Sequence, residues 1–118
     1  MIDLTDTLRG AVSAVVPCAQ AYPARAAAFP CAAVYESGNA VQARCGGRDY
    51  LSALEYTIEI GAPGAGVTHA LSVRIDEAVG ALGLSRVSCT DLYDSALRVH
   101  RRVMRYRVLC DADGTLYQ

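Results

Sequence analysis

The residue types best suited to chemistry in this chain are five cysteines and two histidines. His69 and His100 stand far apart, and the cysteines are Cys18, Cys31, Cys45, Cys89 and Cys110. Zinc sites use ligands at short spacings such as Cys-x-x-Cys, which do not occur here. A nucleophilic triad would need a cysteine, a histidine and a carboxylate brought together, and no local pattern does so. The sequence therefore predicts no enzyme, no metal and no cofactor, and we expect buried, free thiols.

Two glycine-containing stretches resemble ligand-binding loops. The stretch Gly61–Gly66 lies between a predicted strand and a predicted helix, as a phosphate-binding loop would. That loop needs a lysine where this chain has Val67, and the chain contains no lysine. The stretch Asp111–Gly114 resembles the start of a calcium loop but lacks its later oxygen ligands. We interpret the first as a flexible connection and the second as a plain turn.

An arginine-rich stretch near the C-terminus is the most unusual local feature. It contains Arg98, Arg101, Arg102, Arg105 and Arg107. These side chains could contact nucleic-acid phosphates, could form a solvated strand face paired with Glu55, Glu59 and Asp91, or could form a subunit contact or the lining of a ring. Tyr106 is the only interleaved aromatic residue and the formal net charge is −1, which favours the last two interpretations.

Length and composition indicate one domain with a single core. The chain has 118 residues, of which 53% are hydrophobic, yet no run of eighteen apolar residues predicts a membrane span. Asp3 and Asp6 lie where a signal peptide would carry positive charge, so we expect no export. All 11 basic residues are arginine, which pairs well with carboxylates at interfaces.

The order of apolar patterns predicts an α+β fold. Helical spacing predicts helices over residues 3–16 and 67–82, the first ended by Pro17 and the second by Gly83. We expect strands over 31–36, 41–45, 50–61, 84–91 and 96–110, a possible short edge strand over 18–22, and a turn at 37–39. The predicted order is α-β-β-β-α-β-β, a mainly antiparallel sheet of four to five strands with both helices packed on one face.

The stretch Tyr50–Gly61 is predicted to be the middle strand, because its apolar residues alternate cleanly. One side carries Leu54, Tyr56, Ile58 and Ile60, which we expect in the core. The other side carries Ala53, Glu55, Thr57 and Glu59, which we expect in water. In the strand over 84–91 we expect Val87 and Cys89 on the inner side. In the last strand the alternation changes phase near Val103, which predicts a bulge or a bend there.

Taken in order, these elements resemble the tail terminator proteins of long-tailed bacteriophages, also called tail completion or tail-to-head joining proteins. The likeness covers nearly the whole chain but includes no short diagnostic motif. It is carried by Val15-Val16-Pro17, Tyr22-Pro23, the segment Phe29–Val34, the segment Leu54–Ile60, the helix ended by Gly83, and the segment Arg101–Tyr106.

The resemblance implies an α+β subunit that forms a hexameric ring on the last ring of the tail tube. Such a ring ends tube polymerisation, joins the head-side connector or stopper protein, and lets DNA pass through its lumen without sequence-specific binding. The resemblance implies no catalytic residues and no membrane contact, and places the protein in the virion after assembly in the host cytoplasm. A closed ring needs two complementary surfaces on one subunit.

Several residues are candidates for that interface. They are Glu55 and Glu59 of the middle strand, Arg98, Arg101, Arg102, Arg105 and Arg107 of the last strand, and Phe29, which ends the apolar stretch 24–29. A neighbouring head-completion, stopper or minor tail protein is the first alternative. A small nucleic-acid-binding module that uses the arginine-rich strand is the second.

Overall fold

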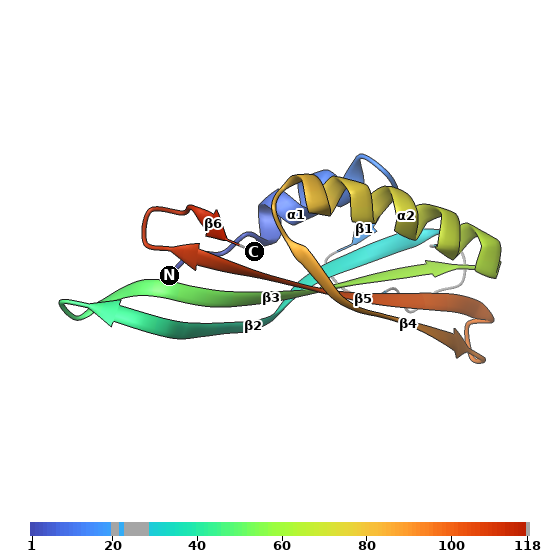
Figure 1. Cartoon of the computed structure of the whole chain (residues 1–118). Coiled ribbons are helices and arrows are strands. Elements are labelled where there is room, and N and C mark those ends of the chain that lie inside the picture. The colour runs from blue at the N-terminus through green and yellow to red at the C-terminus, as the bar shows by residue number, and fades with distance from the viewer. Residues whose placement is uncertain (20–21, 23–28, 118) are drawn as a thin grey trace.

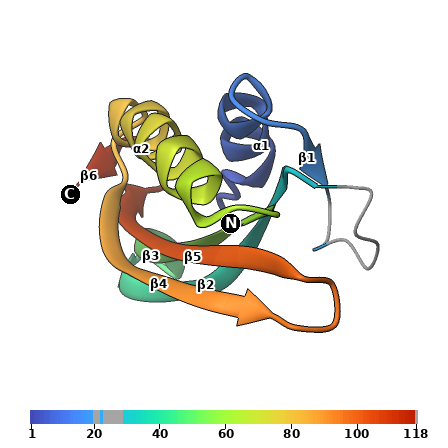
Figure 2. The ribbon, with the colours of Figure 1, turned by 90° about the vertical axis from the view of Figure 1, so that its right-hand side faces the viewer.

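A computed structural model describes residues 1–19, 22 and 29–117, without the side chains of residues 45 and 48–50. The described chain forms one six-stranded mixed sheet with two helices on one face (Figures 1 and 2). The elements are α1 (Thr5–Ser13), β1 (Cys18–Ala19), β2 (Cys31–Cys45), β3 (Arg48–Ala62), α2 (Ala65–Ala81), β4 (Ser85–Asp94), β5 (Val99–Asp111) and β6 (Leu116–Tyr117). The α+β class and the helices on one face are therefore confirmed.

The strand order is β1-β2-β3-β5-β4, with β6 paired to β5, so β3 lies in the middle of the sheet as predicted. All strand pairs are antiparallel except β1 with β2, which is parallel and only two residues long. The predicted strand over 18–22 is thus shorter, and most of its remainder lies outside the described residues. The short β6 was not predicted, and β4 extends three residues beyond its predicted end.

The predicted turn at 37–39 is wrong, because β2 continues through Ser37-Gly38-Asn39 as one strand of 15 residues. The strand absorbs these turn-forming residues as a register shift between Glu36 and Gly38 against a regular β3. Two further shifts follow between Val41 and Arg44. The pairing of β2 with β3 therefore outweighs the local turn propensity of Ser37-Gly38-Asn39.

Of the bulge or bend predicted near Val103, the bulge is wrong, since β5 pairs with β3 without a register shift. The irregularity lies in β4 instead, between Arg86 and Ser88. It turns Val87 outward, so that its side chain is 62% exposed although it was expected inside. The last strand begins at Val99 rather than residue 96, because Asp94 Oδ1 accepts hydrogen bonds from the N–H groups of Ala96 and Leu97 and closes a turn.

The core lies between the helices and one face of the sheet, where the alternation of β3 was predicted correctly. Leu54, Tyr56, Ile58 and Ile60 have no exposed surface and pack with α1 and α2. Leu8 and Val12 come from α1, and Ile75 and Val79 from α2, at the spacing expected for an apolar helix face. We call this face of the sheet the covered face and the opposite one the open face.

The link between β3 and α2 is shorter than expected. The strand continues to Ala62 and the helix begins at Ala65, so only Pro63 and Gly64 connect them (Figure 1). Two residues cannot wrap around a phosphate group as a glycine-rich loop does. The flexible Gly61–Gly66 connection is therefore a tight junction. Gly83, with φ of 104°, follows the end of α2 as predicted.

Candidate functional site

The arginine-rich stretch does not form one surface. Successive strand residues point to opposite faces, so Arg101, Arg105 and Arg107 lie on the open face. Arg102 lies on the covered face, the side of the buried Met104. Arg98 lies outside β5, in the preceding turn, with a left-handed φ of 54°. The prediction of a single arginine face is therefore wrong, although the predicted pairing with carboxylates is confirmed in part.

Glu59 of β3 is the centre of a polar cluster on the open face. Its Oε1 lies 3.1 Å from Nη2 of Arg101 and accepts a hydrogen bond from the hydroxyl of Tyr35 at 3.4 Å. The guanidinium of Arg101 stacks over the ring of Tyr22 at 4.1 Å from its centroid. We call these four residues the Glu59 cluster. Glu59 was expected in water, but these neighbours leave it only 8% exposed.

Phe29 extends the cover of this part of the open face. Its ring packs against Tyr22 with 5.4 Å between centroids, directly over Gly61 of β3. A Cβ atom at Gly61 would overlap the Phe29 ring and lie 2.8 Å from the Tyr22 hydroxyl, so only glycine fits there. The structure thus places Phe29 against its own sheet. The rest of the apolar stretch 24–29 lies outside the described residues.

Burial has a clear effect on the two tyrosines of the Glu59 cluster. It raises the pKa of Tyr22 to about 12, although the nearby Arg101 acts in the opposite direction. Burial also raises the pKa of Tyr35, and the adjacent Glu59 carboxylate adds to this rise. Both phenols are therefore neutral at physiological pH. Tyr35 acts as a hydrogen-bond donor and Tyr22 as a stacking group, and neither acts as an acid or a base.

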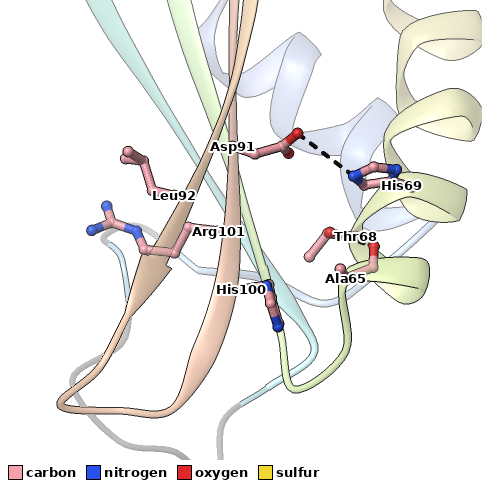
Figure 3. A pocket seen from close by; sticks show the side chains of 7 residues that line it. All are labelled: Ala65, Thr68, His69, Asp91, Leu92, His100 and Arg101. Carbon is pink, nitrogen blue, oxygen red and sulfur yellow. Dashed lines mark hydrogen bonds and ion pairs between the residues drawn. The ribbon is translucent and has the colours of Figure 1, made fainter.

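A second cluster joins α2 to β4 and β5 on the covered side of the sheet (Figure 3). Asp91 Oδ2 lies 3.6 Å from His69 Nε2 in the first turns of α2. Its Oδ1 lies 3.6 Å from Nη1 of Arg102, whose Nε donates to Cys89 Sγ at 2.8 Å. His100 stands nearby, with its ring 5.0 Å from that of Tyr93. We call this group the Asp91 cluster.

A cavity beside the Asp91 cluster has a volume of about 200 Å³ and is lined by His69, His100 and Asp91 among others. Small-molecule sites usually enclose about 300–1,000 Å³. Figure 3 shows Arg101 and Leu92 on the side of the two strands away from His69, so the lining groups do not converge on one point. Among the described residues, no three histidine, cysteine, aspartate or glutamate side chains are placed to hold a metal ion.

Two tyrosines tie the helices to the sheet. The hydroxyl of Tyr106 donates to Asp76 Oδ1 in α2 at 2.8 Å, and Asp76 also pairs with Arg86 of β4 at 3.7 Å. The hydroxyl of Tyr56 accepts a hydrogen bond from the N–H of Leu4 at 2.7 Å. Burial raises the pKa of Tyr56 to about 12 and also raises that of Tyr106, where the Asp76 carboxylate adds to the effect.

The cysteines are poor candidates for nucleophiles. Cys18, Cys31, Cys89 and Cys110 are all free, as expected, and two of them are buried. Burial raises the pKa of Cys18, Cys31 and Cys110, so the reactive thiolate is scarce at neutral pH.

The stretch Asp111–Gly114 forms a plain turn, as predicted. Asp111 Oδ1 accepts hydrogen bonds from the N–H groups of Asp113 and Thr115, and Oδ2 accepts one from the hydroxyl of Tyr117. These bonds, led by the one from Thr115, lower the pKa of Asp111. The Asp111 carboxylate therefore stabilises the turn that contains it.

Three of the predicted interface residues are directed outward on the open face, and a fourth, Arg98, is exposed in the turn before β5. Glu55, Arg105 and Arg107 are exposed on the open face. The register places Glu55 opposite Arg107 and Thr57 opposite Arg105. A shallow depression of about 320 Å³ beside them includes Gly38, Ala40 and Ala53. The sequence analysis did not identify Tyr22 and Tyr35 as residues that contact the charged side chains of the open face. The only signal in the sequence for these contacts was the alternation of charged residues on β3.

Comparisons with known proteins do not assign the chain. No protein-family model matches it, and no curated protein sequence matches it significantly. Within the described residues, no helix is long and apolar enough to cross a membrane.

Proposed function

We propose that the chain is a structural virion protein: a phage tail terminator that caps the tail tube as a ring. In this role it ends tube polymerisation at the head-proximal end of the tail and forms the joint to the head-side connector. Copies of the chain, the tail tube protein and the connector are its partners, and it has no enzymatic activity. DNA passes through the ring without sequence-specific binding.

The observation that best supports this proposal is how the described polar side chains are used. Glu59, Asp91 and Asp111 are each bound to groups of their own sheet or turn. Their geometry holds elements together and does not present an acid, a base and a nucleophile to one cavity. A protein built in this way acts through its surfaces, which agrees with the family that the order of elements resembles.

The shape of the subunit offers such surfaces. The molecule measures 52 × 24 × 21 Å, and the hairpin of β2 and β3 projects beyond both helices (Figure 1). On the open face, Glu55 and the arginines Arg105 and Arg107 place opposite charges side by side. Opposite charges on one subunit can meet their complements on the next copy, and a head-to-tail contact that closes on itself makes a ring.

The proposal is tested on the assembled particle. We expect electron microscopy of virions that encode this chain, labelled with an antibody against it, to show it at the head-proximal end of the tail. Addition of the purified chain to growing tail tubes is expected to stop their elongation. Virions that lack the chain would contradict the proposal, and a position on the head side of the joint would indicate a stopper or head-completion protein instead.

A charge reversal tests the open face as the ring contact. Arg107→Glu is expected to weaken the capping of tubes at least tenfold, because it reverses the charge that the open face offers to the next copy. Arg74→Glu on exposed α2 is the matched control and should cap normally. Equal capping by both variants would exclude Arg107 from the contact.

Exposed Arg105 and Arg107 also favour the nucleic-acid alternative, because neither is part of an ion pair within the described residues. A DNA-binding module would bind duplex DNA with an affinity that falls steeply with salt. The double variant Arg105→Ala with Arg107→Ala would then lose that binding. Under the structural proposal, we expect weak binding that differs little between the variant and the native chain.

A further inference from the structure

The two edges of the sheet differ in a way that indicates how the free chain associates. The edge at β2 is guarded, because β1 pairs with it at Ala32 and Ala33 and three register shifts interrupt it between Glu36 and Arg44. Bulges of this kind protect an edge from pairing with another chain. The edge at β4 has a single register shift, between Arg86 and Ser88, and neither a shift nor a further strand of the described chain protects it from Ser88 to Asp94.

Strand β4 ends the sheet and runs regularly from Ser88 to Asp94 against β5. In the described structure no strand pairs with its outer side, so alternate N–H and C=O groups point into water. No lysine or proline interrupts β4, and three of its apolar side chains are exposed: Val87 at 62%, Leu92 at 49% and Tyr93 at 57%. An exposed, regular and partly apolar edge strand is a template for another strand.

The charges of β4 indicate which strand that is. Arg86 lies near the start of β4, and Asp91 and Asp94 lie near its end. Antiparallel pairing of β4 with the same strand of a second copy brings the positive start of each strand to the negative end of the other. A contact between identical patches related by a two-fold axis is self-complementary in this sense.

The edge of β2 from a second copy fits less well. The pairings of the sheet make β2 and β4 run in opposite directions, so a sheet continued head-to-tail would pair β4 antiparallel with the partner's β2. In the register of the sheet itself, that arrangement brings Arg86 level with Glu36 and Asp91 level with Ala32. The outer side of β2 is already paired with β1 at Ala32 and Ala33, so β4 of another copy could not pair there.

We propose that two copies of the chain dimerise through antiparallel pairing of β4 with β4 about Thr90. In an antiparallel pair, residues directly opposite share a face. The two-fold axis must therefore lie midway between the two copies of one residue, which face each other across it. An axis at Asp91 would place two carboxylates opposite each other. An axis at Thr90 places Asp91 opposite Cys89 and Leu92 opposite Ser88, and aligns the two threonines, a favourable cross-strand pair.

This inference does not rest on the proposed function. A closed ring needs head-to-tail contacts, which a two-fold joint cannot supply. The two proposals therefore concern different surfaces and can fail separately.

The test uses light scattering on the purified chain together with two lysine variants. We expect a dimer for the native chain and a dissociation constant at least tenfold higher for Leu92→Lys, because the new charge lies beside the joint. Val73→Lys is the matched control, since Val73 is equally apolar, is 60% exposed and lies on α2. A native monomer, or a dimer that Leu92→Lys does not weaken, would overturn the inference.

Disulfide trapping provides a second test that does not depend on the folding of Leu92→Lys. Under mild oxidation, two copies of Thr90→Cys are expected to become linked through their introduced thiols, a cross-link identified by mass spectrometry, whereas two copies of Ser37→Cys on the exposed part of β2 are not. No such cross-link in Thr90→Cys would overturn the inference. A cross-link between the two variants in a mixture would also overturn it, and would show head-to-tail contact as the ring requires.

Discussion

The covered and open faces of the sheet come from the same strands but are buried in different ways. On the covered face, helices at regular spacing bury Tyr56 and Ile58 of β3 completely. On the open face, Thr57 and Glu59 are almost as buried, yet what surrounds Glu59 is an arginine and two tyrosines from separate parts of the chain. Apolar alternation identifies the first kind of burial, whereas the second depends on individual contacts.

The largest expected effect comes from ionising the tyrosines of the covered face. The folded pKa of Tyr56 is raised from 10.0 to about 12, and that of Tyr106 is also raised. Because a raised pKa stabilises the neutral form in the folded state, this stability is complete below pH 10 and is lost as the pH rises through about 12. We expect cooperative unfolding in that range, followed by circular dichroism.

Absorbance of the phenolate form gives the control for this alkaline transition. Exposed Tyr93 has no buried hydroxyl to protect, so Tyr93→Phe should leave the transition unchanged. If all tyrosines ionised before the circular dichroism changed, Tyr56 and Tyr106 would not be the groups that the folded state protects.

A cavity in the covered face is expected to have the next largest effect. Ile58→Ala should lower the free energy of unfolding by about 2–5 kcal/mol, because Ile58 is fully buried between β3 and the helices. Val103→Ala on the open face is the comparison, and since Val103 is only half-buried we expect about 1 kcal/mol. Equal losses in urea denaturation would show that the two faces are packed alike.

Overfilling the open face is expected to cost less. Gly61→Ala places a methyl group against Phe29 and Tyr22, which must shift, so we expect a loss of about 1–3 kcal/mol and a change in tyrosine fluorescence. Gly10→Ala in α1 has free space around it and should stabilise the protein by about 0.5–1 kcal/mol. An unchanged stability for Gly61→Ala would mean that Phe29 does not cover the sheet in solution.

The smallest effect is expected from the charge of the Glu59 cluster. Glu59→Gln keeps the shape but removes the charge that Arg101 pairs with, and should cost about 1–2 kcal/mol because the pair is only partly shielded from water. Exposed Glu55→Gln should change stability by less than about 0.5 kcal/mol. Both changes are measured by urea denaturation at neutral pH. If Glu59→Gln left the free energy of unfolding unchanged, the Glu59 cluster would be no more than a surface contact.

The sequence predicted the covered face better than any other part of the molecule. The alternation of β3 and the helical spacing of α1 and α2 report directly on burial against a second layer, and these residues form the core. The central position of β3 and the turn at Asp111–Gly114 were also predicted. These features depend on residues close together in the chain.

The features that were missed depend on pairing between distant segments. Ser37-Gly38-Asn39 has the composition of a turn, yet the regular β3 alongside keeps β2 extended. The outward position of Val87 follows from a register shift that no local pattern marks. The burial of Glu59 requires Arg101, which lies 42 residues further along the chain. For the candidate interface, the sequence identified the charged residues but not the division of the arginines between two faces.

The pairing of β3 along its whole length has a consequence for isotope exchange. β2 borders it from Arg48 to Gly61 and β5 from Leu51 to Ala62, so nearly every amide of its central part is bonded within the sheet. In deuterium oxide these amide protons can leave only when the whole sheet opens, whereas those of the hairpin tip at Gly46 and Gly47 leave through local fraying. The middle of β3 is thus the segment that keeps its hydrogen longest, and its exchange rate reports the global stability of the protein.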